Sequence, residues 1–483
     1  MTILLSAAEL AKFAKVGGLA DIAYALPLGW EMCGHIPIIV LPYYRAIKQE
    51  KNHQIQDIKL QLIIHSLKVH VHKSQLPNSS IPVFLVECDE LYDRDGIYGN
   101  PDGFQDNDLR FYVLCKAAFE IMIALGISPD IISAHDYHTA LMLPLLKNEY
   151  AHHPLFIHTK GVLTIHNAQY QGWYENQRMI EISDWDLSSS EADSPFLLHG
   201  SFNALKAGIE FADAIVAVSP GYAQEIKTKE FGEGLEDAFL RIKSKLSGIL
   251  NGVDYQTWDP QHDSYIPFHF SPLDTSGKLH GKARLLSNCF GNDVEHSTLP
   301  LLGMVSRFTD QKGIELLEDS LEVFLQKKKC KLIVLGSGED QYQKYFQKLQ
   351  MNFPDTCCYT QGYDEQLAHN ILAYSDFFLM PSRFEPCGLT QLYAMRYGTV
   401  PIVRYVGGLK DTVHDIDSQE NIGDGIVFED FTSKACHDAI ERALYTYQNT
   451  QSMNIARQHA MQADFSIEHT AEAYIQLFKK LLS

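Results

Sequence analysis

Short apolar segments alternate with longer amphipathic ones along most of the chain. In the first half, strand-sized runs of β-branched and large aliphatic residues lie at 3–5, 36–41, 83–86, 131–133, 162–165 and 214–218. Between two of these runs, an apolar stripe at helical spacing predicts a helix whose buried face carries Phe111, Leu114, Ala118, Ile121 and Leu125. Strands that alternate with helices predict a parallel sheet with helical crossovers.

A second series of strand-sized runs begins beyond the middle of the chain, at 301–305, 332–335, 377–380 and 400–403. A chain of 483 residues is too long for one ordinary core. The sequence therefore predicts an α/β fold with two doubly wound, Rossmann-like domains, at 1–247 and 248–465, that face a cleft between them. Residues 259–300 show little periodicity, and we expect a long surface excursion there.

Composition narrows the choice of partners. The formal net charge of −20 disfavours nucleic acid and anionic membrane surfaces, whereas a neutral polysaccharide would meet no such repulsion. No apolar run approaches the ~18 residues of a membrane span, and the chain opens on a core strand rather than an export signal. The nine cysteines form no Cys-x-x-Cys pair, which predicts reduced thiols in a cytoplasmic protein, with neither disulfides nor a zinc site.

The most informative candidate site follows the apolar run 377–380. Residues 381–390 read Pro-Ser-Arg-Phe-Glu-Pro-Cys-Gly-Leu-Thr, so they would present one carboxylate, a glycine amide and a hydroxyl where a buried strand ends. Doubly wound enzymes bind ligands at this edge of the sheet. Taken alone, the segment could equally be an ordinary turn with a solvated glutamate.

Two further strand ends carry groups suited to anionic oxygen. Lys15-Val-Gly-Gly-Leu-Ala-Asp21 follows the first apolar run and combines a cation with exposed amides. Arg307 and Lys312 lie five residues apart after the run 301–305. Two cations at one strand end suit a diphosphate. Each pattern is weak alone, but three such strand ends in one chain are much harder to dismiss.

Histidines gather at two other strand ends, in His135-Asp-Tyr-His138 and in His166-Asn167. Three interpretations stay open: a metal site, histidines that serve only the sheet edge, or contacts from Asp136 and His166 to sugar hydroxyls. We favour the sugar contacts. Other histidines lie in polar segments that we expect to be irregular and exposed, without a function: His70, His72, His152 and His153.

These motifs together resemble, in the same order, those of bacterial glycogen synthases and plant starch synthases. The resemblance spans nearly the whole chain and rests on segments 15–21, 135–138, 166–172, 251–254, 307–313 and 382–391. It implies a GT-B fold whose last helix, within 466–483, crosses back to the first domain. It also implies that glucose is transferred from ADP-glucose to the non-reducing end of an α-1,4-glucan, with retention at the anomeric carbon, so that glycogen is elongated.

The residue chemistry on the donor side agrees with that resemblance. Breaking the bond between the sugar and the diphosphate leaves negative charge on the leaving group and positive charge on the sugar, and both need stabilisation. We expect Glu385 to orient the glucose and face its positive charge. The groups expected around the diphosphate and neighbouring oxygens are Arg307, Lys312, Lys15, Gly17, Gly18, Cys387, Gly388, Leu389 and Thr390. By resemblance, Tyr363 stacks on the base, and Asp21 closes the N-terminal motif on the donor side.

On the acceptor side, the resemblance implies that Asp136 and His166 act beside the sugar and that Tyr137 and Asn167 contact the glucan. Position 393, where many relatives of the wider fold carry a second glutamate, is a tyrosine. We therefore expect a front-face displacement, in which the leaving phosphate takes the acceptor proton, rather than a double displacement. We expect no metal or other cofactor.

Two positions depart from the family pattern, because Tyr137 stands where tryptophan is common and Lys12 where proline is common. Other activities stay open: a UDP-glucose donor, another retaining transferase of the same fold, or a catalytically silent glucan-binding scaffold. The diphosphate cations disfavour the scaffold, since binding a glucan does not require them.

Overall fold

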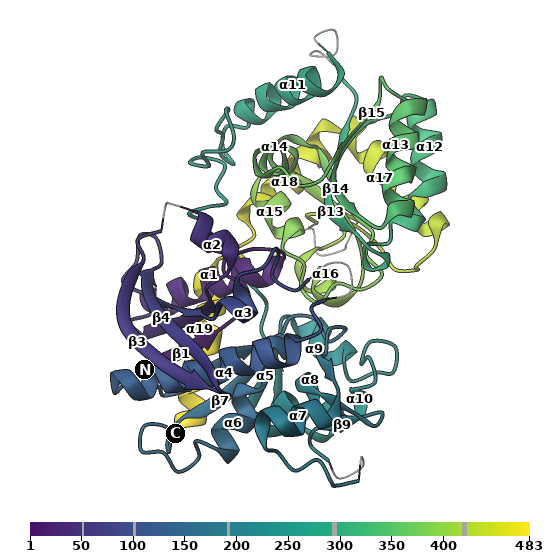
Figure 1. Cartoon of the computed structure of the whole chain (residues 1–483). Coiled ribbons are helices and arrows are strands. Elements are labelled where there is room, and N and C mark those ends of the chain that lie inside the picture. The colour runs from purple at the N-terminus through teal and green to yellow at the C-terminus, as the bar shows by residue number, and fades with distance from the viewer. Residues whose placement is uncertain (51–52, 100–102, 191–193, 292–296, 418–422) are drawn as a thin grey trace. The chain divides into compact units, whose positions relative to one another are not determined.

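The computed structural model describes residues 1–50, 53–99, 103–190, 194–291, 297–417 and 423–483, which form two compact units (Figure 1). The first unit comprises Met1–Gly252 and Ile467–Ser483, and the second comprises Val253–Ser466. The chain thus enters the second unit slightly beyond residue 247. Among the described helices, none is long and apolar enough to cross a membrane.

A nine-stranded sheet of order β12-β11-β7-β6-β1-β2-β5-β4-β3 forms the first unit. Its strands are β1 (Thr2–Ser6), β2 (Ile36–Pro42), β3 (Gln56–Ile64), β4 (Leu67–Gln75), β5 (Pro82–Glu87), β6 (Ile131–His135), β7 (Lys160–Ile165), β11 (Ala214–Ala217) and β12 (Leu246–Gly248). All neighbours are parallel except at the β5–β4–β3 edge. The strands predicted from the first apolar series are confirmed.

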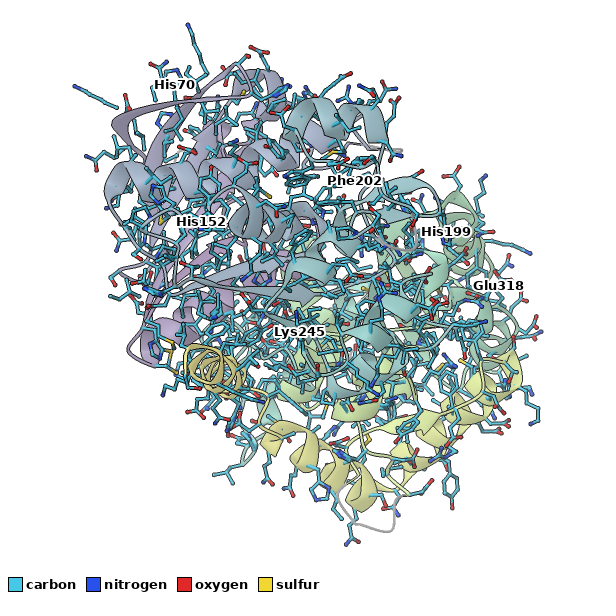
Figure 2. The ribbon with its side chains drawn as sticks, turned by 90° about the horizontal axis from the view of Figure 1, so that it is seen from below. His70, His152, His199, Phe202, Lys245 and Glu318 are labelled. Atoms are coloured by element: carbon cyan, nitrogen blue, oxygen red, sulfur yellow. The ribbon has the colours of Figure 1, made fainter. Side chains whose placement is uncertain are left out.

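The β3–β4 hairpin corrects one expectation. His70 and His72 lie in a regular strand rather than an irregular segment, because Val69 and Val71 alternate with them and are fully buried. His70 is exposed on the outer face (Figure 2). The Nε2 atom of His72 lies 2.7 Å from Oε2 of Glu87 on the neighbouring strand.

Helices cover the first sheet. They are α1 (Gly18–Met32), α2 (Arg45–Gln49), α3 (Asp89–Tyr92), α4 (Asn107–Leu125), α5 (Asp136–Ala140), α6 (Met142–Asn148), α7 (Asn176–Ser183), α8 (Ala204–Phe211), α9 (Pro220–Glu225), α10 (Glu236–Arg241) and α19 (Ile467–Leu482). The predicted stripe of α4 is buried as far as Ile121, but Leu125 is exposed because the helix ends there and Gly126 turns the chain away. A small sheet joins β8 (Trp173–Tyr174), β10 (Ser201–Asn203) and β9 (Leu197–Leu198).

The last helix, α19, packs on α1 although the two are far apart in sequence (Figure 1). A Cβ atom at Gly29 would lie 2.7 Å from the Cβ of Ala471, so the glycine allows the helices to approach closely. Beside it, the buried ring of Trp30 meets the rings of Tyr474 and Phe478. These contacts make α19 part of the core of the first unit.

The second unit is a six-stranded parallel sheet of order β15-β14-β13-β16-β17-β18. Its strands are β13 (Leu301–Phe308), β14 (Lys331–Gly338), β15 (Cys357–Gln361), β16 (Phe377–Met380), β17 (Val400–Arg404) and β18 (Ile426–Phe428), and they include every strand of the second predicted series. Its helices are α11 (Ser276–Phe290), α12 (Glu318–Gln326), α13 (Asp340–Asn352), α14 (Glu365–Tyr374), α15 (Thr390–Arg396), α16 (Gly407–Thr412), α17 (Ser433–Gln448) and α18 (Thr450–Gln462), with short 3₁₀ turns at Asp310–Lys312 and Ile314–Leu316. Residues 259–300, predicted as a long surface excursion with little periodicity, contain the regular helix α11.

Each large sheet reverses its winding direction once. The first unit continues from β1 to β2 on one side and places β6 on the other side, so the reversal lies between β1 and β6. In the second unit, β14 and β16 flank β13 in the same way. Ligands of open α/β sheets bind at such switch points, beyond the carboxyl ends of the strands.

Candidate active site

The glycine-rich loop after β1 lies at the switch point of the first sheet. The Nζ atom of Lys15 lies 2.7 Å from Oδ1 of Asp21, and Lys15 and Gly18 are exposed. The N–H of Gly17 donates to Oε2 of Glu9 at 2.8 Å. This hydrogen bond already engages one of the two predicted amide donors. Gly18, by contrast, begins helix α1, where the first N–H groups have no intrahelical acceptor.

Lys12 precedes this loop in a left-handed conformation, with φ of 67°. Proline cannot adopt this value, because its ring fixes φ near −65°. The Nζ atom of Lys12 donates to the Tyr24 hydroxyl at 2.9 Å. The loop is therefore held differently from one that carries proline at this position.

Asp136 lies across the same switch point, directly after β6. Its backbone is left-handed, with φ of 52°, which is a strained conformation for a non-glycine residue and is common at functional sites. Its Oδ1 atom accepts the N–H groups of His166 at 2.7 Å and Asn167 at 3.3 Å. Burial raises the pKa of Asp136 to about 7, although these two hydrogen bonds act against the rise. Near neutral pH, this carboxyl therefore exists in both protonation states.

The histidines beside Asp136 form a pair in which His135 is fully buried and His166 is partly exposed. His135 Nδ1 lies 2.9 Å from His166 Nε2, so one ring donates and the other accepts. Burial lowers the pKa of His166 and of His138 to about 3, so both rings are neutral near pH 7. Within the described parts of the chain, no three His, Cys, Asp or Glu side chains converge as a metal site, so the metal interpretation gains no support from them.

Tyr137 and Asn167 line the neighbouring surface. The half-buried ring of Tyr137 packs on His138, with the ring centroids 3.8 Å apart. The ring also approaches Gly172, where a Cβ atom would lie 2.6 Å from it. The Oδ1 atom of Asn167 accepts the N–H of Gln169 at 3.0 Å. The structure thus brings Asp136, Tyr137, His166 and Asn167 together, as the strand ends predict.

In the second unit, Lys312 and Glu385 meet at the switch point between β13 and β16. Lys312 Nζ lies 2.7 Å from Oε2 of Glu385, which also accepts the hydroxyl of Ser382 at 3.0 Å. Within the described residues, no hydrogen bond reaches the other oxygen, Oε1. The side chain of Glu385 is 8% exposed, so a nearly buried carboxylate keeps one oxygen without a protein donor.

The loops that carry Lys312 and Glu385 are bound to each other by their backbones. The N–H of Arg383 donates to the carbonyl of Gln311 at 2.8 Å. Gly313 lies against the backbone of Pro381. A Cβ atom at Gly313 would lie only 2.1 Å from the carbonyl oxygen of Pro381, so no larger residue fits without a shift. Its φ of 64° also favours glycine. These contacts fix the ammonium against the carboxylate.

Arg307 and Tyr363 lie at the same edge of the second sheet. Arg307 is the seventh residue of β13 and is exposed, and it forms no ion pair with the carboxylates of the described residues. Tyr363 follows β15 and is 66% exposed. An exposed cation and an exposed ring at one sheet edge suit a nucleotide diphosphate.

The four predicted donor-binding residues after Glu385 differ in the groups that they can offer to a ligand. Gly388 has φ of 75°, as the predicted turn requires, and Leu389 precedes helix α15. Cys387 is 4% exposed and therefore offers mainly its backbone. The hydroxyl of Thr390 lies 3.5 Å from the sulfur of Met380, so it already has an internal partner.

Sequence reasoning missed a second glycine pair, Gly407 and Gly408, which begins α16 after β17. The N–H of Gly408 donates to the carbonyl of Glu385 at 2.9 Å, so the pair supports the loop that carries Glu385. A signal was present, because Val406-Gly-Gly-Leu409 repeats the letters of Val16-Gly-Gly-Leu19. Glu9 and Ser382 were also missed.

Comparison with known proteins shows that the chain is similar to glycosyltransferases. Residues 2–241 match the family model described as the starch synthase catalytic domain, and residues 292–459 match glycosyl transferases group 1. A glycogen synthase of Aeromonas hydrophila is 38% identical over 495 residues, which cover 100% of this chain and 99% of the relative. One from Streptococcus equi subsp. zooepidemicus is 37% identical over 484 residues, covering 100% of both chains.

Two solved structures are also similar. The catalytic domain of Starch Synthase IV from Arabidopsis thaliana, bound to ADP and acarbose, matches with a TM-score of 0.91 at 30% identity, covering 100% of this chain and 99% of that one. A sucrose-phosphate synthase from Thermosynechococcus elongatus matches with a TM-score of 0.62 at 16% identity, covering 99% and 98%, and this likeness concerns the fold alone. The predicted pair of Rossmann-like domains of the GT-B fold is confirmed, and the chain belongs to the glycogen synthase and starch synthase family of glycosyltransferases.

Proposed function

We propose that this glycosyltransferase moves glucose from ADP-glucose to the non-reducing end of an α-1,4-glucan, with retention at the anomeric carbon. The observation that carries the proposal is the match along the entire chain with a solved starch synthase bound to ADP and acarbose. Full-length identity to glycogen synthases of 37% and 38% points to glycogen as the product. The side chains at the strand ends provide the cations and the carboxylate that this reaction needs.

In the proposed donor site, Arg307 and Lys312 neutralise the diphosphate as it leaves, assisted by Lys15 and the Gly18 amide. Preorganised donors at a developing charge each contribute about 3 kcal/mol to lowering a barrier. The free oxygen of Glu385 faces the glucose. Tyr363 offers a ring to the base of the nucleotide, and the solved starch synthase is bound to ADP.

In the proposed reaction, an acceptor hydroxyl attacks the anomeric carbon from the face that the diphosphate leaves. The bond from that carbon to the phosphate oxygen breaks, and the proton of the hydroxyl passes to the same oxygen. Double displacement in retaining hydrolases uses a second carboxylate close to the first. Tyr393 cannot supply one, and its ring stacks on Trp258 with the centroids 3.8 Å apart. Asp136 and His166 would bind sugar hydroxyls, with Tyr137 and Asn167 next to the glucan.

Two further features belong to this proposal. The diphosphate charge is balanced by side chains, so catalysis needs no divalent metal or other cofactor. The location is cytoplasmic, which fits nine cysteines that all carry free thiols.

The test is an initial-rate assay of glucose transfer to glycogen, run in parallel with ADP-glucose and UDP-glucose, each with and without EDTA. Faster transfer from ADP-glucose that survives EDTA, with an α-linked product, is the expected result. Preference for UDP-glucose would overturn the donor, and loss of activity with EDTA would overturn the metal-free mechanism. Glycogen binding without transfer from either donor would identify a scaffold.

A further inference from the structure

Glu9 is a buried carboxylate to which the proposed chemistry gives no role. It follows β1 and is 3% exposed. Its Oε2 atom accepts two backbone N–H groups of the glycine-rich loop, from Val16 at 2.5 Å and from Gly17 at 2.8 Å. A buried carboxylate is costly unless its oxygens are hydrogen-bonded, so these contacts bind the loop tightly to the end of the first strand.

The other oxygen of Glu9 is engaged by Tyr98, which lies between α3 and α4. Tyr98 donates its hydroxyl to Oε1 of Glu9 at 2.5 Å. The ring of Tyr98 stacks on His138, with centroids 4.8 Å apart and an interplanar angle of 29°. Asn107 holds the Tyr98 backbone by donating to its carbonyl at 3.0 Å. A continuous chain of contacts therefore joins the glycine-rich loop to the helix turn that begins with Asp136.

Both oxygens of Glu9 are thus used inside the protein. Glu9 also lies near enough to Asp136 for its charge to add a small contribution to the raised pKa of that group, after the larger effect of burial. A residue in this position does not need to contact a substrate. It can determine where Lys15 and the Gly18 amide stand relative to Asp136.

We propose that Glu9, acting with Tyr98, is a positioning residue that fixes the glycine-rich loop against the Asp136 turn, so that both meet one nucleotide sugar in the correct geometry. This inference rests on the proposed function, because the ligand that the two loops share is the donor. Misplacement of a binding group by about 1 Å can cost about 100-fold in rate even without direct contact.

The variants Glu9→Ala and Glu9→Gln separate positioning from charge. Glutamine has the same shape: its Oε1 can accept both loop N–H groups, and its amide can donate to the hydroxyl oxygen of Tyr98, which is also an acceptor. Alanine removes all three contacts. We expect Glu9→Ala to lower kcat/KM for ADP-glucose by about 100-fold and to weaken ADP binding in calorimetry, whereas Glu9→Gln stays within several-fold of wild type.

Asp213→Ala is the matched control for stability. Asp213 also accepts a glycine N–H, from Gly161 at 2.7 Å, and pairs with Lys147 at 2.7 Å in the same unit. We expect Asp213→Ala to lower the Tm but to leave KM for ADP-glucose unchanged. If Asp213→Ala and Glu9→Ala reduce transfer equally, or if Glu9→Ala leaves kcat/KM intact, the positioning role is refuted.

Two more variants keep the test decisive if Glu9→Ala does not fold. Glu9→Asp retains the charge but is one carbon shorter, so it cannot reach both the loop and Tyr98; it must be less active than Glu9→Gln. Tyr98→Phe keeps the ring on His138 and removes the hydroxyl, and it must raise KM for ADP-glucose. The opposite ranking, or an unchanged KM, overturns the inference. Absence of transfer by wild type would instead refute the proposed donor.

Discussion

The ammonium group of Lys312 lies 2.7 Å from Oε2 of Glu385. The two side chains are 17% and 8% exposed, so this ion pair is largely shielded from water. The cation expected at the diphosphate and the carboxylate expected at the sugar therefore hold each other in place before a substrate arrives. Removing one partner of a buried pair typically costs about 3 to 5 kcal/mol, because the other charge stays buried alone.

Glu385→Gln tests the carboxylate. The amide keeps the shape and can still accept from Ser382, so the variant should fold, but it cannot oppose positive charge on the sugar. We expect transfer to fall by about 1000-fold, with glycogen binding unchanged. The assay is kcat with ADP-glucose. Glu315→Gln, which changes a carboxylate that pairs with Arg383 at 2.6 Å, is the control and should stay active. Near-wild-type turnover in Glu385→Gln would remove Glu385 from the mechanism.

Arg307→Ala tests the exposed cation of β13. Because Arg307 forms no ion pair within the described residues, its loss leaves no buried charge, and the Tm should hardly change. Turnover should fall by about 100-fold, since the leaving diphosphate loses a preorganised cation. Arg307→Lys should recover part of that loss. Arg284→Ala removes an exposed arginine from α11 and serves as the control. Equal kcat in Arg307→Ala and the control would contradict the role.

The strands were predictable wherever they form continuous apolar runs, as at 36–41, because central parallel strands are buried on both faces. The helix α11 was not predictable in this way. Two of its buried positions are lysines, and Lys278 donates to the carbonyl of Ala373 at 2.6 Å while Lys282 pairs with Asp376 at 2.5 Å. Polar anchors of this kind interrupt the apolar periodicity by which a helix is recognised.

The candidate site also contains residues that the sequence predicts and residues that it does not. Lys312 and Glu385 were predictable because each follows a strand, and the carboxyl ends of neighbouring parallel strands meet. Glu9 was not, since it lies in an alanine-rich segment without a turn signal. Its importance depends on amides seven and eight residues later and on a tyrosine far along the chain. Contacts of this kind arise only once the chain is folded.

Gly313→Ala tests how closely the two loops of the second unit approach. Alanine at this position would have to adopt a positive φ, which destabilises the folded state by about 1 kcal/mol. Its Cβ would also clash with the carbonyl oxygen of Pro381 at 2.1 Å. Gly126 is a matched control, because its φ of 66° is nearly the same but nothing lies within 4 Å of a Cβ there. We expect Gly313→Ala to lose more stability in urea denaturation, and also kcat, because Lys312 is displaced. Equal losses in the two variants would show that the close approach is unimportant.

Asp136→Asn tests the raised pKa of Asp136. Its folded pKa of about 7 exceeds the value of about 4 for an unfolded chain. Between these two pH values the folded state holds a proton that the unfolded state has released. The contribution of Asp136 to the free energy of unfolding is therefore complete below about pH 4 and is lost as the pH rises through 7. Asparagine does not titrate. We therefore expect the free energy of unfolding of the variant, relative to wild type, to increase by roughly 2 to 3 kcal/mol between about pH 5 and pH 8.

Urea denaturation at several pH values measures this difference. The comparison with wild type is essential, because burial lowers the pKa of His138 and His166 to about 3 and their protonation in acid acts with the opposite sign. Both histidines are present in both proteins, so their effect cancels. Asp130→Asn, which removes an exposed carboxylate from the same unit, controls for the change in charge. If the relative stability of Asp136→Asn stays constant across this pH range, Asp136 is ionised throughout. Its carboxylate would then be a fixed acceptor for sugar hydroxyls rather than a group that can also donate.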